Sequence, residues 1–158
     1  MKTLLLSQGY VAVVDDADYE DVAQFKWSVL RAGQWLYAMR TWREDGRGRC
    51  ELMHRRILGL HRGDPTKVDH RDGDGLNNQR NNLRPATDAQ NMWNSRRPRN
   101  NTSGYKGVSY YTAKRKWCAE ISAHSKRKKL GYFDSPEEAY AAYCRAAAEL
   151  HGEFFNFG

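Results

Sequence analysis

Four side chains within a stretch of 23 residues have the types needed to activate water beside a metal ion: Asp69, His70, Asn82 and Asn91. The Asp69 carboxylate and the Asn91 carboxamide offer hard oxygen donors, which suit Mg²⁺. An imidazole titrates near neutrality, so His70 can accept a proton from water. The side-chain carbonyl of Asn82 can fix the tautomer of that imidazole. The set could therefore hold the cation and supply the base that phosphodiester hydrolysis requires.

Each of these residues alone has an ordinary explanation. An isolated loop histidine is usually a surface residue, and asparagines after Gly and Asp, such as Asn77 and Asn78, are usually turn residues. The joint pattern favours a hydrolytic site over these separate explanations.

The local sequence predicts the elements that carry this set. Pro65 and the pair Gly73 and Gly75 mark loops around a short strand at 67–69. Thr87, followed three residues later by Gln90, is a capping-box pattern, which predicts a helix from Thr87 with Asn91 in its first turns. Upstream, short apolar runs at 4–6, 10–14 and 36–39 predict strands, and residues 18–27 and 52–60 have helical character. A β-rich layer should therefore support the site.

The C-terminal third has a different pattern. Three strand-like runs occupy 106–111, 116–123 and 128–133, and Ser135-Pro136 opens a helix that ends near Gly152. Alternation along the second run turns Trp117, Ala119 and Ile121 toward that helix. The predicted fold class is α+β, with a first domain at 1–95, a basic linker at 96–104, and a three-stranded antiparallel sheet packed on one helix at 105–158.

Charge is distributed unevenly along the chain. The net charge is +7, and residues 96–130 carry eleven Lys and Arg against one acid, Glu120. Such a band is typical of a surface that binds a polyanion. A solvated basic face or tail is the alternative, but the band is interleaved with Tyr, Trp and Ile, unlike a tail.

Composition excludes several classes of protein. Hydrophobic residues make up 40%, which argues against wholesale disorder. Three cysteines without a C-x-x-C pair predict neither a disulfide framework nor a cysteine zinc site. No apolar run approaches 18 residues, so no membrane span is expected, and no secretory signal is evident at the N-terminus. A reducing cytoplasm is the expected location.

Three segments resemble the HNH homing endonucleases of the subgroup with a final Asn: MHRRILGL (53–60), VDHRDGDGLNNQRNNLR (68–84) and ATDAQN (86–91). The resemblance implies a ββα-metal motif, built from a two-stranded hairpin, a metal ion and a helix. It implies Asp69 and Asn91 as ligands of Mg²⁺ or Mn²⁺, His70 as general base and Asn82 as the residue that orients the base. His54 matches a histidine often present in the first segment, with either a phosphate contact or a structural role.

The C-terminal segments GVSYYTAKRKWCAEISA (107–123), KKLGYF (128–133), SPEEAYAAY (135–143) and AAAELHGEF (146–154) resemble the ethylene-response-factor (APETALA-type) DNA-binding domain. The resemblance implies a sheet that lies in the major groove, with its helix behind. The residues predicted to contact DNA are Arg96, Arg97 and Arg99 in the linker, and Lys106, Ser109, Tyr111, Lys114, Arg115, Glu120, Ser122, Arg127 and Lys129 in the module.

Together these resemblances imply a homing-type endonuclease that acts on double-stranded DNA. One active site per chain makes a monomer the simpler expectation, which either nicks DNA or makes two cuts in succession. A DNA-binding regulator without catalytic activity is the alternative. An RNA-binding protein is less favoured, because the sequence places no clear aromatic pair on the outer face of the C-terminal sheet.

Overall fold

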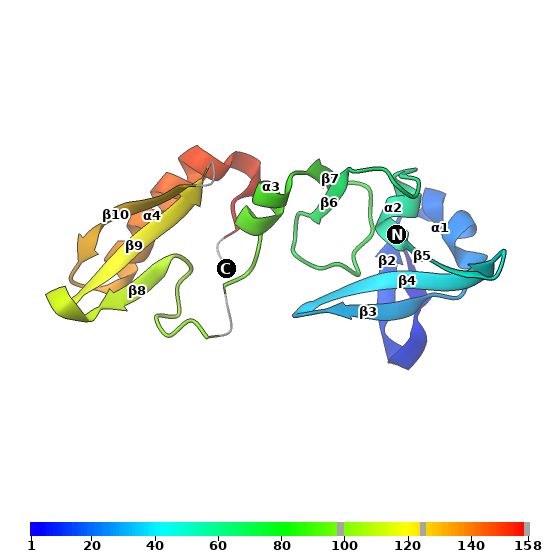
Figure 1. Cartoon of the computed structure of the whole chain (residues 1–158), viewed down its shortest axis with the longest axis horizontal. Helices are drawn as coiled ribbons and strands as arrows, with labels where there is room; N and C mark the ends of the chain where they lie inside the picture. The colour runs from blue at the N-terminus through cyan, green and yellow to red at the C-terminus, as the bar shows by residue number, and fades with distance from the viewer. Residues whose placement is uncertain (98–99, 124–125, 157–158) are drawn as a thin grey trace. The chain divides into compact units, whose positions relative to one another are not determined.

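The computed structural model describes residues 1–97, 100–123 and 126–156, and its contacts divide the chain into two units, Met1–Ala86 and Thr87–Gly158. The fold class is α+β, as predicted, with small antiparallel sheets and four α-helices in the described ranges (Figure 1). None of those helices is long and apolar enough to cross a membrane. Arg99 of the predicted DNA-binding set lies outside the described residues.

The first unit contains a hairpin, a three-stranded sheet and two helices before the candidate site. The hairpin pairs β1 with β2, and the three-stranded sheet has the order β3-β4-β5. The bounds are β1 (Lys2–Leu5), β2 (Val11–Val14), α1 (Asp16–Ala23), β3 (Ser28–Ala32), β4 (Trp35–Glu44), β5 (Arg47–Leu52) and α2 (Met53–Ile57), with a 3₁₀ turn at Ser7–Gly9. The three-stranded sheet is larger than the sequence analysis predicted, because β3 and β5 contain few alternating apolar residues.

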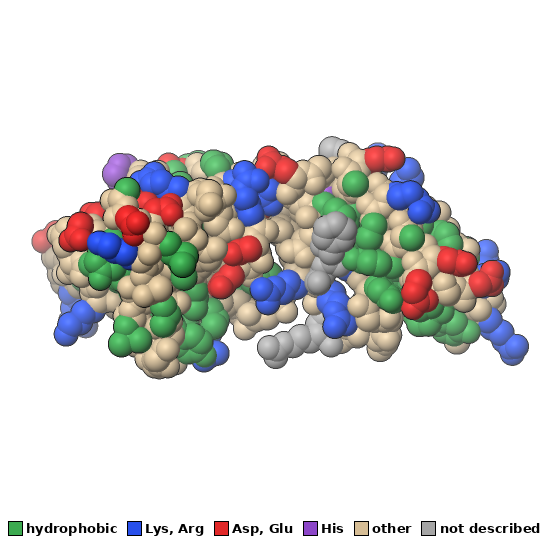
Figure 2. Space-filling model, turned by 180° about the vertical axis from the view of Figure 1, so that it is seen from behind, with side chains coloured by type: hydrophobic (Ala, Val, Ile, Leu, Met, Phe, Trp, Pro, Cys, Tyr) green, Lys and Arg blue, Asp and Glu red, His purple; other side chains and the backbone are tan. Residues whose placement is uncertain are grey.

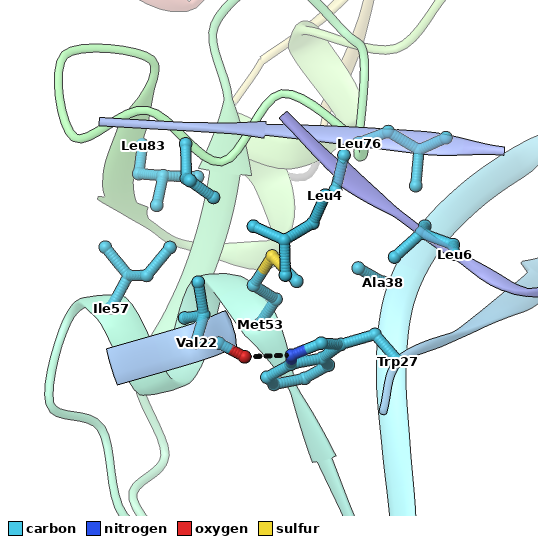
Figure 3. Close-up of a cluster of buried hydrophobic side chains, with 11 residues drawn as sticks. Leu4, Leu6, Val22, Trp27, Ala38, Met53, Ile57, Leu76 and Leu83 are labelled. Atoms are coloured by element: carbon cyan, nitrogen blue, oxygen red, sulfur yellow. Dashed lines mark hydrogen bonds between the residues drawn. The ribbon is translucent and has the colours of Figure 1, made fainter. Parts of the chain in front are cut away.

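One apolar cluster joins these elements (Figure 3). Met53 from α2 and Val22 from α1 are fully buried in it, and the Trp27 indole N–H donates to the Val22 carbonyl at 2.7 Å. Leu76 and Leu83, which flank the segment 77–82, are buried in the same cluster. The core of the first unit therefore anchors the loop that carries the candidate site residues.

The candidate site lies on and beside a second hairpin, formed by β6 (Lys67–His70) and β7 (Leu83–Ala86). The long connection between these strands is held against β2, because Val13 N–H donates to Leu76 O at 2.9 Å and Asn78 N–H donates to Val13 O at 2.8 Å. This connection therefore has a defined position although it contains no long regular element.

The second unit contains α3 (Asp88–Trp93), the sheet of β8 (Val108–Tyr111), β9 (Lys116–Ala123) and β10 (Lys126–Phe133), and α4 (Pro136–His151). Short 3₁₀ turns occupy Thr112–Lys114 and Gly152–Phe154. The sheet is antiparallel with β9 at its centre, and α4 covers one face of it (Figure 1). This arrangement confirms the predicted three-stranded sheet backed by one helix.

Both predicted helix starts in this region are confirmed. Thr87 accepts from the backbone N–H of Gln90, and the Gln90 side chain accepts from the backbone N–H of Thr87. Ser135 accepts from the backbone N–H of Glu138, with Pro136 as the first helical residue. These caps satisfy backbone donors that a helix leaves unpaired, which is why the sequence signals identify the starts so well.

Candidate active site and nucleic-acid interface

Asp69 and His70 end strand β6 and are both buried, at 6% exposed each. Asp69 lies opposite Arg84 of β7 in the ladder, and the Arg84 guanidinium donates to Asp69 Oδ2 through Nε and Nη2, at 2.7 Å in both cases. Two guanidinium nitrogens on one carboxylate oxygen fix the orientation of the Asp69 carboxylate. Removal of either partner would leave an uncompensated buried charge.

The Asn82 side chain forms hydrogen bonds with the loop that follows His70. Its Oδ1 accepts from the Asp72 N–H at 3.0 Å, and its Nδ2 donates to Asp72 Oδ1 at 2.9 Å and to Asn77 O at 2.8 Å. Within the described ranges, none of these bonds reaches the imidazole of His70. The structure thus places the Asn82 side chain in the loop beside His70, and its role in orienting the base stays a prediction.

Asn78 is the carboxamide that the structure brings into interaction with His70. Burial lowers the pKa of His70, while the carboxylates of Asp72 and Asp69 and a side-chain interaction with Asn78 oppose the shift. Asn78 is fully buried, and its Nδ2 donates to Leu76 O at 3.0 Å. No sequence signal points to this role, because Asn77-Asn78 soon after Gly75 is typical of a turn.

His54, in α2, lies beside His70 with its ring edge-on. The two ring centroids are 5.0 Å apart, and the Tyr37 ring lies 5.7 Å from His54 and 5.8 Å from His70. Burial, followed by the proximity of His70 and Arg55, lowers the pKa of His54 to about 3. His54 Nδ1 is buried without a hydrogen-bond partner in the described part of the chain. His54 is therefore neutral, buried and packed on His70, which favours a structural role over a phosphate contact.

Asn91 lies in α3 and therefore in the second unit. Its Oδ1 is buried and has no hydrogen-bond partner among the residues that the structure describes. A carboxamide oxygen of this kind is a hard donor that suits a divalent cation, as is the carboxylate of Asp69 in the first unit. Across 1–97, 100–123 and 126–156, no group of three or more His, Cys, Asp or Glu side chains could hold a metal ion.

Gly75 has a packing role in the first unit. A Cβ at this position would lie 2.3 Å from Leu36 O and 2.6 Å from the Tyr37 ring, the same ring that packs on both histidines. We expect Gly75→Ala to lower the free energy of unfolding by about 1–3 kcal/mol, because the backbone of β4 must move. Gly48→Ala is the matched control, since nothing lies within 4 Å of its Cβ. Equal urea midpoints for the two variants would contradict this packing role.

The residues predicted to contact DNA fall into two groups in the second unit. Six of them line one cavity of about 600 Å³: Arg96, Lys106, Ser109, Glu120, Ser122 and Arg127. Arg97, Tyr111, Lys114, Arg115 and Lys129 are exposed. Acidic side chains stand beside basic ones on the face in Figure 2, so the charge there is mixed.

Lys106 is the exception in this set, because it does not project to the surface. It is 9% exposed, and its ammonium donates to the backbone carbonyls of Trp93, Ser95 and Asn156. Burial lowers its pKa to about 8. Lys106, which the sequence predicts to contact DNA, therefore directs its ammonium to carbonyl groups of its own unit.

An aromatic pair does lie on the outer face of the sheet, contrary to the sequence-based expectation. The rings of Tyr111 and Tyr132 are 5.3 Å apart, and Lys114 Nζ lies 4.1 Å from the Tyr132 ring. Lys129 Nζ lies near both rings and donates to the Tyr132 hydroxyl at 3.0 Å. The strand register explains this pair. Tyr132 of β10 and Ser109 of β8 flank Cys118 of β9, so both lie on one face of the sheet, and Tyr111, two residues after Ser109, lies on the same face. This cluster combines aromatic rings, on which bases can stack, with positive charge, and that combination is typical of surfaces that bind nucleic acid.

Comparison with known proteins identifies two domains. An HNH endonuclease family model matches residues 51–93, and an AP2 domain model matches residues 103–153. Protein 3.8 of Escherichia phage T7 is 38% identical over 90 residues, which cover 57% of this chain and 74% of that protein. No solved structure matches. HNH nucleases generally use divalent metal ions, and the two domains indicate a nuclease that binds DNA. The chain thus joins an HNH endonuclease domain to an AP2 domain and belongs to the same family as Protein 3.8 of Escherichia phage T7.

Proposed function

We propose that this protein is a homing-type DNA endonuclease that hydrolyses phosphodiester bonds with Mg²⁺ or Mn²⁺. The observation that carries the proposal is the adjacent, buried pair Asp69 and His70 at the end of β6, within the HNH match. The similarity to a phage protein agrees with a DNA target inside an infected bacterial cell. The chain acts as a monomer in this proposal, with one such site.

His70 is the general base in the proposed mechanism. Its burial lowers the pKa, so the imidazole is neutral at neutral pH and can take the proton of the attacking water. Tyr37 and His54, which also contact each other, both pack against the ring and limit its rotation. Asn82 holds the loop 72–77 through three hydrogen bonds and thereby keeps Asp72 and Asn78 beside the base. The protein thus orients the base by packing as well as by polar contacts.

Asp69 and Asn91 are the proposed ligands of the cation. Arg84 orients the carboxylate of Asp69 through Oδ2, and the capping box at Thr87 fixes the start of the helix that bears Asn91. When bound, a divalent cation would stabilise the negative charge that develops on the scissile phosphate. The domain boundary remains a proposal at residue 95, close to the HNH match that ends at 93.

Nicking of supercoiled plasmid DNA with Mg²⁺, with Mn²⁺ and with excess EDTA tests this proposal. We expect nicking with either metal ion and none with EDTA. Asp69→Asn keeps an acceptor for Arg84 but removes the ligand charge, so nicking should fall about tenfold or more at limiting metal, the range for a disturbed metal site. Glu44→Ala, an exposed carboxylate in the same unit, is the control.

Two outcomes would reject the proposal. Nicking at an undiminished rate in EDTA would exclude the role of the metal ion. Tight duplex binding without any nicking would favour a DNA-binding regulator instead.

A further inference from the structure

Helix α3 is short, and its C-terminal end is held by the AP2 part of its own unit. The helix has six residues, none of them buried, and a helix of this length is not stable by itself. Its N-terminus is capped by its own residues Thr87 and Gln90. The carbonyl groups at its C-terminus need partners from elsewhere, as at any helix end.

Lys106 supplies those partners. Its Nζ donates to the carbonyl of Trp93, the last residue of α3, at 2.6 Å, and to the carbonyl of Ser95. A third carbonyl, that of Asn156, lies at 3.5 Å. A cation at the C-terminus of a helix is favourable because the carbonyl dipoles point toward it. The buried ammonium therefore caps α3 and joins it to the segment that follows the AP2 match.

Two further contacts fix the same end of α3. The Trp93 indole stacks on the His151 imidazole, with centroids 4.5 Å apart and planes 9° from parallel. His151 Nε2 donates to Ser122 O at 3.0 Å, which ties the ring to β9, the central strand of the sheet. Asn156 Nδ2 donates to Asn94 Oδ1 at 3.2 Å, and Asn94 is buried. Contacts from Lys106, from His151 of α4 and from Asn156 of the C-terminal segment thus converge on 93–95.

We propose that Lys106 and His151 are positioning residues of the nuclease: they fix the helix that bears Asn91, so the AP2 domain takes part in metal binding as well as in DNA binding. This inference rests on the proposed role of Asn91 as a metal ligand. This positioning role explains why Lys106, in a basic band of the sequence, is buried with its ammonium near three backbone carbonyls. Helix α3 and the three-stranded sheet belong to the same unit.

The test uses the full chain with Lys106→Met, which removes the charge and keeps the length of the side chain. Lys106→Gln retains N–H donors and should rescue part of the effect. Lys128→Met removes an exposed charge from the same unit and is the control. Amide hydrogen exchange of residues 88–95 measures the anchoring of α3, electron paramagnetic resonance measures Mn²⁺ affinity, and duplex affinity is measured in parallel.

We expect Lys106→Met to accelerate exchange in 88–95 and to weaken Mn²⁺ binding about tenfold, as loss of an outer partner of a ligand does. Duplex affinity should match that of Lys128→Met. In an Asn91→Ala background, Lys106→Met should weaken Mn²⁺ binding no further, because the two residues act through one ligand. His151→Leu, which removes the stack, should act in the same direction as Lys106→Met.

Several results would overturn the inference. Faster exchange with unchanged Mn²⁺ affinity would make Lys106 a purely structural residue. An equal loss in the Asn91→Ala background would show that it acts by another route, and a wild-type chain that binds no Mn²⁺ would remove the basis of the inference. Mn²⁺ binding without nicking would reject the proposed function alone, and leave the positioning role intact.

Discussion

Replacement of His70 by alanine is expected to lower the rate of plasmid nicking by roughly 10² or more, while duplex affinity stays close to that of the wild type. The reason is that a positioned proton acceptor contributes to the transition state and not to the binding of the DNA duplex. His70 is buried at the end of β6, where its ring packs on His54 and Tyr37. Single-turnover nicking at saturating metal separates the chemical step from binding.

The exposed His61, in the same unit, provides the matched control as His61→Ala. This control should nick DNA at the wild-type rate. Urea unfolding measures the stability of both variants and so checks that loss of the His70 side chain has not unfolded the first unit. Parallel losses of nicking and duplex affinity in a folded His70→Ala protein would assign His70 a structural role in place of a catalytic one.

The second large effect is expected from the charges on the outer face of the C-terminal sheet. Lys114, Arg127 and Lys129 are exposed there, and we expect all three to contact phosphates. Their joint replacement by glutamine should make the plot of log affinity against log salt shallower by about 2.7, since each lost contact releases about 0.9 fewer counterions. Between about 50 and 200 mM salt, the wild type should therefore lose roughly 40-fold more affinity than the variant.

The control removes the same charge from the first unit, through Lys26, Arg43 and Arg47, which are also exposed. If affinity depends mainly on the AP2 domain, this control should leave the salt slope nearly unchanged. A comparable change in slope would place phosphate contacts in both units. Tighter binding of single-stranded RNA than of duplex DNA would instead assign the Tyr111–Tyr132 cluster to base stacking.

The sequence by itself determined the elements whose signals are local. The Thr87–Gln90 and Ser135–Glu138 caps were predicted because a side chain three residues from a backbone N–H satisfies it within one turn. The central strand was predicted at 116–123 as observed, because apolar residues alternate along it. The adjacency of Asp69 and His70 is covalent, so no folding was needed to identify the pair.

A further local signal lies at Asp45-Gly46, between β4 and β5. Asp45 and Gly46 both have positive φ and form the two-residue turn that pairs Glu44 with Arg47. Asp-Gly between extended segments is a strong hairpin signal, and it would have predicted β5.

The tertiary structure alone decided which polar groups meet. Lys106 lies in a basic band whose pattern predicts exposure, yet three carbonyls from 93–95 and 156 surround its ammonium. The Asn82 side chain bonds to Asp72, and Asn78 is the carboxamide that interacts with His70. The physical reason is the same in each case. A buried donor or acceptor needs a partner, and here the partner comes from another segment of the chain, which only folding brings within reach.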